Sequence, residues 1–263
     1  MNILVCVKRV PDTAENEIEI NAAGNDIERD DLVYSVNEWD NYAVEEAIQL
    51  RDKLGGSVTV VTVGDEDSEE VLRREMAMGA DNGILLSEES FAGSDGQGIA
   101  RSLKGVVGKG SYDLILTGAQ ADEGAAQVGG MLAAMLDYPY ASLVNEIEVL
   151  DDSKLKVGRE IEGGNQEVNE IELPCVLSIQ TGINEPRYVG IRGIRKVASV
   201  EIPEYSASDL GLSAQDVGES AARVKRVDYF VPEMGEGAEI LEGDTEDVAA
   251  RLAEMLKAKG GIK

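Results

Sequence analysis

Short apolar runs alternate with segments of helical periodicity through the first half of the chain. The apolar runs span residues 2–8, 57–63, 82–86 and 113–117. Each is short enough for one strand, and each is followed by a stretch in which apolar residues recur at helical spacing. Strands that alternate with helices in this way predict an α/β fold, a doubly wound and mostly parallel sheet with helices on both faces.

From about residue 142 the pattern changes to longer runs. Residues 143–150, 154–161 and 166–179 are interpreted as added strands, antiparallel in part. Within the last run, residues 171–179 are apolar and contain Pro174 near their start, which indicates a buried strand. Residues 1–200 are therefore predicted to form one α/β domain.

The last part of the chain has a different composition. Residues 201–244 are acidic, rich in turns and poor in core residues, and one predicted helix follows them. A segment that cannot bury enough apolar surface does not fold by itself. Residues 201–263 are therefore predicted to be a C-terminal arm and helix that wrap another subunit.

The composition argues against several classes of function. A formal net charge of −27 argues against binding to nucleic acid or to an anionic membrane, because both need basic surfaces. The chain contains no histidine, which excludes Ser-His-Asp catalysis and imidazole-based zinc sites, and no metal site is expected. Cys6 and Cys175 both fall in predicted buried strands and are expected to be small core residues. Without a signal peptide or an apolar stretch of about 18 residues, we expect a cytoplasmic protein with no membrane span.

A loop rich in glycine and alanine follows the predicted strand 113–117. Residues 118–130 lead into a predicted helix that includes residues 127–136. Small residues before a helix N-terminus at the carboxyl end of a parallel strand suit an anion such as phosphate. The alternative is that they only permit close packing of the helix on the sheet. Asp122 and Glu123 would repel a phosphate, so we expect them to point outward or to meet ribose hydroxyls.

The stretch between residues 159 and 191 contains sequence motifs that are specific to one protein family. Three segments resemble the signature of the beta subunit of electron transfer flavoprotein: Arg159-Glu160-Ile161-Glu162-Gly163-Gly164, Leu173-Pro174-Cys175-Val176-Leu177-Ser178-Ile179-Gln180, and Asn184-Glu185-Pro186-Arg187-Tyr188-Val189-Gly190-Ile191. Further matches are Cys6 to Asp12, Asn37 with Ala43 to Ala47, Ala77 to Asp81, and Gln127 to Gly129. The resemblance covers most of residues 1–200 and is specific because the segments occur together.

The resemblance implies a heterodimer. In this family the alpha subunit carries a redox-active FAD on a mobile domain, and the beta subunit is a shallow α/β bowl that binds an adenine nucleotide. The positions that match the family's nucleotide-binding residues are Cys6, Asn37, Asp40, Val63, Gly118, Ala119, Gln120, Ala121, Gln127, Val128 and Gly129.

A second segment bears on which nucleotide is bound. Ordinary members of the family hold AMP, whereas electron-bifurcating members hold a second FAD that meets NADH and splits its two electrons. Phe91-Ala92-Gly93-Ser94-Asp95 resembles a segment typical of the bifurcating type, and a glycine-containing loop has room for a flat isoalloxazine ring. The alternative is a plain helix-entry turn capped by Ser94 or Asp95. The resemblance implies FAD, with AMP as the alternative, and NADH as a substrate of the complex in the FAD case.

The resemblance also implies contacts with partners. Residues 184–200 resemble the family's recognition loop, which docks a flavin-dependent dehydrogenase of the acyl-CoA or 2-hydroxyacid type, and Ile191 matches its apolar anchor. Glu160 matches a carboxylate that steadies the mobile flavin domain through an arginine of the alpha subunit; its alternative is a solvated strand residue. The expected partner contacts are Glu160, Glu185, Arg187, Tyr188 and Ile191.

Three functions compete at this point: a subunit of an electron carrier, a free-standing adenine-nucleotide-binding sensor, and a self-sufficient enzyme. The enzyme is disfavoured because the chain has no histidine and no evident pair of nucleophile and base. A sensor has no use for an arm that cannot fold alone. The sequence therefore favours the electron-carrier subunit, which would oxidise NADH only as part of a bifurcating heterodimer.

Overall fold

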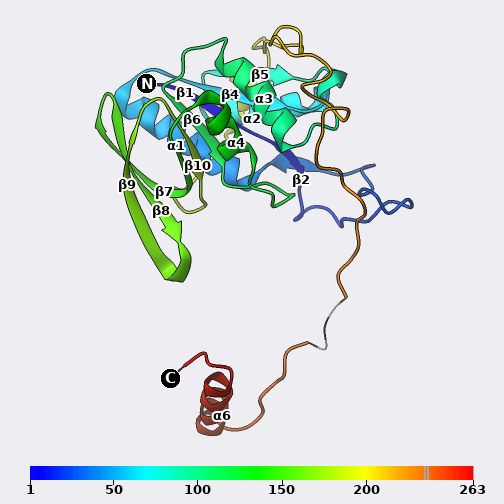
Figure 1. The fold of residues 1–263 in the computed structure, drawn as a ribbon, viewed down its shortest axis with the longest axis vertical. Coiled ribbons are helices and arrows are strands. Elements are labelled where there is room, and N and C mark those ends of the chain that lie inside the picture. The colour runs from blue at the N-terminus through cyan, green and yellow to red at the C-terminus, as the bar shows by residue number, and fades with distance from the viewer. Residues whose placement is uncertain (234, 236, 263) are drawn as a thin grey trace. The chain divides into compact units, whose positions relative to one another are not determined.

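The computed structural model describes residues 1–233, 235 and 237–262 (Figure 1). The described chain divides into two compact units. The first comprises residues 1–19 and 28–227, and the second comprises the described residues of 20–27 and 228–263. Within the part of the chain that is described, no helix is long and apolar enough to cross a membrane.

An eight-stranded sheet forms the centre of the first unit, in the order β5-β4-β1-β6-β10-β7-β8-β9. Its parallel strands are β1 (Asn2–Cys6), β4 (Ser57–Val63), β5 (Asn82–Leu86), β6 (Leu114–Gly118) and β10 (Cys175–Ile179). The others are β7 (Tyr140–Asp151), β8 (Lys154–Ile161) and β9 (Asn165–Glu172). Strand β7 runs parallel to β10 and antiparallel to β8, which pairs antiparallel with β9. The mostly parallel sheet with added antiparallel strands is the one predicted.

Helices cover both faces of this sheet (Figure 1). The helices of the first unit are α1 (Glu38–Leu54), α2 (Glu69–Met78), α3 (Gly96–Val107), α4 (Val128–Leu136) and α5 (Ile191–Val197). Ile3 and Val5 of β1 pack in one cluster with α1 and α2, whereas Leu4 packs in the other with α3 and α4. This alternation confirms the doubly wound arrangement, since successive side chains of a strand point to opposite faces.

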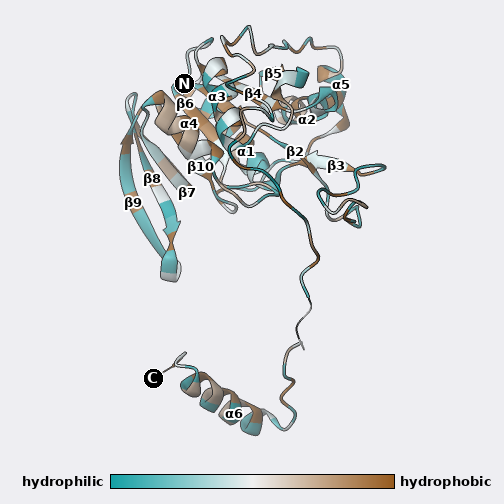
Figure 2. Ribbon diagram, turned by 45° about the vertical axis from the view of Figure 1, so that its right-hand side comes forward, coloured by the Kyte–Doolittle hydropathy of each residue, from teal (hydrophilic) through white to brown (hydrophobic). Residues whose placement is uncertain are grey.

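The prediction of one strand over residues 166–179 was wrong. The segment forms two strands with different neighbours, because β9 pairs with β8 whereas β10 lies between β6 and β7. Pro174 lies between them, and its ring nitrogen cannot donate to a ladder. Figure 2 shows β9 as mostly hydrophilic, in keeping with its exposed side chains, whereas every residue of β10 is buried.

Residues 201–227, which the sequence assigns to the arm, pack with the first unit. The Leu85 amide donates to Pro203 O at 3.0 Å and the Tyr205 amide donates to Leu85 O at 3.0 Å, so this segment pairs with β5 at the sheet edge. Ala207 and Val217 are buried in the cluster that contains α3 and α4. The separate part of the arm therefore begins at residue 228.

The second unit contains an antiparallel bridge between Ile20 and Ile27, and the helix α6 (Thr245–Ala258). The Asp244 carboxylate accepts hydrogen bonds from the amides of Glu246 and Asp247, which caps the helix. None of the residues of α6, all of which are described, is buried.

A small antiparallel pair, β2 (Arg9–Pro11) and β3 (Tyr34–Val36), leads the chain from β1 into α1. It belongs to the first unit. This detour brings the N-terminus of α1 to the carboxyl end of β1, where the Asn37 amide donates to Lys8 O at 2.9 Å.

Candidate functional site

The carboxyl ends of β1 and β6 lie side by side at the centre of the sheet. After β1 the chain reaches α1 on one face, and after β6 it reaches α4 on the other. Ligands of open α/β sheets bind where neighbouring strands continue to opposite faces in this way. The candidate site therefore lies at this edge, where Asn37, Asp40 and the loop from Gly118 to Gln127 meet.

Asp40 connects the two strands. Its Oδ2 accepts from the Lys8 amide at 2.8 Å, and its Oδ1 accepts from the Gly118 amide at 2.9 Å. Burial raises the pKa of Asp40 to about 7, against the hydrogen bonds from Lys8, Asn37 and Gly118, which lower it. Asp40 is thus a positioning residue beneath the loop, held by backbone amides on both sides.

Asn37 holds the loop from the other direction. Its side-chain amide donates to Gln120 O at 2.8 Å, and the residue is buried. The Ala119 amide donates to Ile179 O at 2.8 Å, so the start of the loop is also fixed to β10. Ala119 is buried, whereas Gln120 is exposed.

Lys8 and Arg226 offset the charge of the acidic part of the loop. The Lys8 ammonium forms ion pairs with Asp122 and Glu123, whose side chains are each 42% exposed. Burial opposes the effect, but Lys8 holds the pKa of Asp122 below its ordinary value. Arg226 also pairs with Glu123, at 3.4 Å, so two cations offset the charge of the two carboxylates, and Lys8 is a further functional candidate at this edge.

The N-terminus of α4 approaches the sheet closely because it begins with small residues. A Cβ on Gly129 would clash with Ser178 Oγ and lie 2.8 Å from Thr117 Oγ1. Ser178 Oγ lies 2.8 Å from Thr117 Oγ1 and 3.0 Å from the Tyr140 hydroxyl. Among the described residues no side chain caps the start of α4 at Gln127, so its first amides are available to an anion. A small polar residue in an otherwise apolar strand is the only sequence signal for this hydroxyl cluster.

The segment Phe91 to Asp95 lies next to this helix, since a Cβ on Gly96 would lie 2.9 Å from Gln127 Oε1. Phe91 is buried in the core. Asp95 caps α3, with Oδ1 accepting from the Gln97 and Gly98 amides, while Oδ2 accepts from the Arg223 amide at 2.8 Å.

The remainder of this segment faces the chain's own residues 218–219. The Glu219 amide donates to Ala92 O at 3.0 Å, and the Gly218 amide donates to Ser94 Oγ at 2.8 Å. Gly93 has φ +73°, and a Cβ there would lie 2.8 Å from Glu219 Cβ. The open side of Gly93 is therefore covered by residue 219.

Two further predicted residues border the site from neighbouring strands. Cys6 ends β1 and is buried, and burial, followed by the nearby Asp40, raises the pKa of its thiol. Val63 ends β4 and is half-buried. Cys175 is also buried, and both cysteines are free, so the prediction of small core residues is confirmed.

The predicted partner contacts lie in two places. Tyr188 is 92% exposed and Ile191, the first residue of α5, is 70% exposed. Glu185 and Glu160 are also exposed, and Glu160 accepts from the Gln180 amide group at 3.1 Å.

Arg187 has an internal partner. Its Nε and Nη2 donate to the two carboxylate oxygens of Glu45 at 2.8 and 2.9 Å, and its backbone amide also donates to Glu45. Glu45 is buried, so this bidentate pair fastens the segment 184–190 to α1. The pair leaves Tyr188 and Ile191 as the protruding groups of this surface.

Comparison with known proteins identifies the family. A family model described as the electron transfer flavoprotein domain matches residues 25–210. The chain is 37% identical over 262 residues to the electron transfer flavoprotein subunit beta of Methylophilus methylotrophus. This match covers 97% of this chain and 98% of that protein. It is 36% identical over 261 residues to the subunit of the same name from Thermoanaerobacterium thermosaccharolyticum, covering 98% and 99%. It is 36% identical over 263 residues to the caffeyl-CoA reductase-Etf complex subunit CarD of Acetobacterium woodii, covering 98% and 99%.

The match to the electron transfer flavoprotein domain, on a doubly wound sheet, defines an electron-transfer class of protein. Within that class, the full-length matches are to beta subunits. The chain belongs to the electron transfer flavoprotein beta-subunit family.

Proposed function

We propose that this chain is the nucleotide-holding half of a heterodimeric electron carrier and acts only when paired with an alpha subunit that bears a redox-active FAD. The observation that carries the proposal is the meeting of Asn37, Asp40 and the 118–129 loop at the switch point, in a chain of this family. No member of this set is arranged as a nucleophile with a base. The site is therefore one for binding, and the electron chemistry belongs to the flavin.

The residues at the site fit an adenine nucleotide. The uncapped start of α4 offers backbone amides to a phosphate, and Gly129 lets that helix end reach the sheet. Lys8 and Arg226 offset the negative charge of Asp122 and Glu123 beside it. Asn37 and Asp40 keep the loop in place from below. We assign binding to the set Cys6, Asn37, Asp40, Val63, Gly118, Ala119, Gln120, Ala121, Gln127, Val128 and Gly129.

We propose FAD as the nucleotide, with AMP as the specific alternative. Gly96, which directly follows the bifurcating-type segment Phe91 to Asp95, lies close to Gln127 at the start of α4, and this proximity supports FAD. The covering of Gly93 by Glu219 favours AMP, because that glycine then offers no open face to a ring. A bound FAD would supply two-electron exchange with NADH and one-electron transfer onward. The chain's own contribution is to bind and orient it.

The proposed alpha subunit accounts for the apolar side chains along the arm. Val227, Phe230, Val231 and Ile240 are 84%, 75%, 79% and 78% exposed, and Leu252 of α6 is 47% exposed. Such a series in one segment marks a surface that another protein covers. The name of the Acetobacterium woodii relative describes it as part of a reductase–Etf complex, which supports a second partner, a flavin-dependent dehydrogenase, docking near Tyr188 and Ile191.

The experiment is to co-express this chain with its alpha subunit, measure the mass of the purified complex, and identify the nucleotides released on denaturation. A heterodimer with two FAD supports the bifurcating form, and one FAD with one AMP supports the ordinary form. A stable monomer, or a heterodimer whose only nucleotide is the alpha-subunit FAD, would contradict the proposal. Substituting Gly93 is a poor probe of the choice, since a side chain there would strike Glu219 with either nucleotide.

A further inference from the structure

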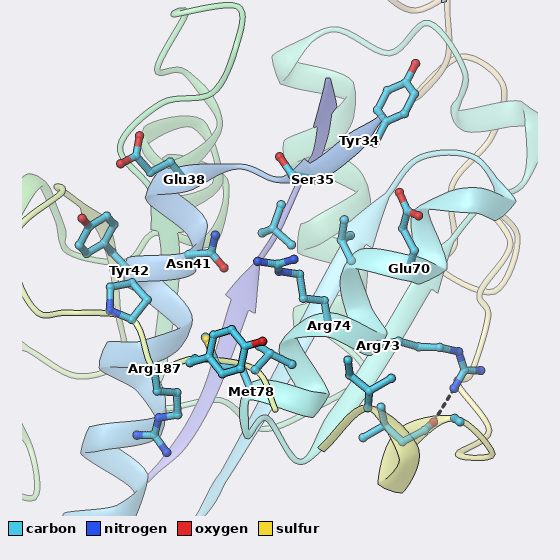
Figure 3. Close-up of a pocket in the computed structure, with 18 residues that line it drawn as sticks. Tyr34, Ser35, Glu38, Asn41, Tyr42, Glu70, Arg73, Arg74, Met78 and Arg187 are labelled. Atoms are coloured by element: carbon cyan, nitrogen blue, oxygen red, sulfur yellow. Dashed lines mark hydrogen bonds between the residues drawn. The ribbon is translucent and has the colours of Figure 1, made fainter. Parts of the chain in front are cut away.

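A pocket lies between helices α1 and α2, lined by residues other than those assigned to the nucleotide site. Its volume is about 960 Å³, and it opens between α1, α2, β3 and the segment 186–198 (Figure 3). Its buried lining residues are apolar, namely Val36, Val71, Met78 and Val197. Pockets of this size and lining accept a ligand or the side chains of a partner.

Arg74 is the unpaired cation of this pocket. Figure 3 shows its guanidinium extending from α2 into the pocket toward Asn41. Among the described residues it has no ion pair and no hydrogen bond to its side chain. Next to it in sequence, Glu75 is fully buried, and burial raises the pKa of its carboxyl to about 8, although the charge of Arg74 lowers it.

Three of the other four charged residues of the lining are already paired, whereas Glu38 has no ion pair with a described residue. Arg73 donates to Val197 O at 2.6 Å, which fastens the end of α5 to α2, and it also pairs with Glu69. Arg187 is bound to Glu45, and Glu70 pairs with Arg9 at 2.6 Å. These contacts build the pocket wall, and they leave Arg74 as the arginine that a ligand can neutralise.

Helix α5 adds positive charge beside the pocket. Its exposed side chains include Arg192, Arg195 and Lys196, and none forms an ion pair with a described residue. The helix approaches α2 closely, since a Cβ on Gly193 would lie 2.5 Å from Ala77 O. The chain has 51 acidic and 24 basic residues, so its net charge is strongly negative, whereas this group of unpaired cations makes the surface of α5 positive.

We infer that this pocket receives an acidic segment of the partner dehydrogenase, with one of its carboxylates paired to Arg74 and its apolar neighbours on the buried lining. The inference rests on the proposed docking function of the adjoining segment. The two proteins would then insert into each other. The acidic segment of the dehydrogenase enters the pocket of this chain, while the Ile191 side chain enters the dehydrogenase. Charge complementarity selects this occupant, because an acidic partner is repelled by most of a surface of net charge −27 and attracted here.

The test uses the intact heterodimer and two substitutions, Arg74→Glu and Arg74→Gln. The control is Lys104→Glu, which makes the same charge change at an exposed position on α3, on the other face of the sheet. The probe is a purified acyl-CoA dehydrogenase chosen because it reduces the wild-type heterodimer. Its rate of flavin reduction is measured against dehydrogenase concentration at low and high salt.

We expect Arg74→Glu to raise the half-saturating dehydrogenase concentration about tenfold or more at low salt, with the maximal rate and nucleotide content unchanged. Arg74→Gln should have a smaller effect in the same direction, and Lys104→Glu should change the value by less than about twofold. High salt should reduce the difference between Arg74→Glu and wild type, because exposed charges are screened.

Three results would overturn the inference in distinguishable ways. If Arg74→Glu behaves like Lys104→Glu while Ile191→Ala weakens the interaction, docking occurs at α5 without use of the pocket. If none of these substitutions weakens it, the proposed docking surface itself is wrong. If sedimentation shows that wild-type heterodimers associate and Arg74→Glu separates them, the occupant of the pocket is a second copy of this chain.

Discussion

At the scale of single residues, Asp40 is the side chain that holds the two strand ends of the site together. Its two oxygens accept backbone amides from β1 and β6, at the point where the two strands diverge. An asparagine side chain at this position can accept only one of the two hydrogen bonds, and its NH₂ group then faces the other backbone donor. The position of the 118–129 loop should therefore depend on the carboxylate itself.

We predict that Asp40→Asn lowers the free energy of unfolding by about 1–3 kcal/mol, the cost of leaving a buried backbone donor without a partner. The variant should also retain less nucleotide through purification. Chemical denaturation and chromatography of released nucleotides measure the two effects. Asp152→Asn, at an exposed position, is the matched control and should change neither. Full nucleotide content in Asp40→Asn would remove Asp40 from the site.

Glu75 is a buried acid without a partner. Both of its carboxylate oxygens are buried and have no hydrogen-bond partner in the described part of the chain. Burial raises its pKa from 4.5 to about 8, so the folded state keeps a proton that the unfolded state releases between these pH values. The stability from this group is complete below about pH 4.5 and is lost as the pH rises to about 8, by ~1.4 kcal/mol per pH unit.

We predict that Glu75→Gln stabilises the chain relative to wild type by an amount that grows from near zero at pH 5 to roughly 2 kcal/mol or more at pH 8. Urea unfolding at several pH values measures it. The nearby carboxylates Asp40 and Glu45 raise the pKa of Glu75 further, so part of this difference comes from their charge. Glu172→Gln on exposed β9 should give a difference independent of pH. A Glu75→Gln difference that does not vary with pH would show that Glu75 is charged in the folded state.

At the scale of elements, residues 217–224 are fastened across the start of α3 by Asp95. Removing this carboxylate deletes the cap of α3 and the anchor of the Arg223 amide together. We predict that Asp95→Ala accelerates tryptic cleavage after Arg223, Lys225 and Arg226, because local opening of this segment costs less. Mass spectrometry of the early fragments measures this. Asp244→Ala removes the equivalent cap from α6 and should leave cleavage at residues 223–226 unchanged.

The elements also show what sequence can and cannot predict. The bounds of β4 and β5 coincide with their apolar runs, because buried parallel strands need continuous apolar sequence. Residues 201–227 gave no such signal, since they attach through backbone pairing to Leu85 and through the widely spaced Ala207 and Val217. The loop 118–129 was found from its glycines, whereas Ser178 and Arg74 were missed because their surroundings are formed by residues far away in the sequence.

At the scale of the whole molecule, the two units differ in how much apolar surface they bury. The first has core clusters on both faces of its sheet. In α6, whose residues are all described, none is buried. We predict that ending the chain after Val227 leaves the first unit folded and lowers affinity for the alpha subunit by a factor of about 100 or more. Circular dichroism and a binding titration measure these outcomes. Undiminished affinity of the shortened chain would show that the alpha subunit binds elsewhere.

We propose that an adenine nucleotide binds where β1 and β6 diverge. Photoaffinity labelling with 8-azido-AMP, applied to heterodimer from which nucleotide has been removed, tests this most directly. We expect light-dependent labelling of this chain at peptides from residues 37–40 or 118–129, suppressed by excess AMP and reduced in Asp40→Asn. Labelling confined to the alpha subunit, or to the pocket beside α5, would contradict it.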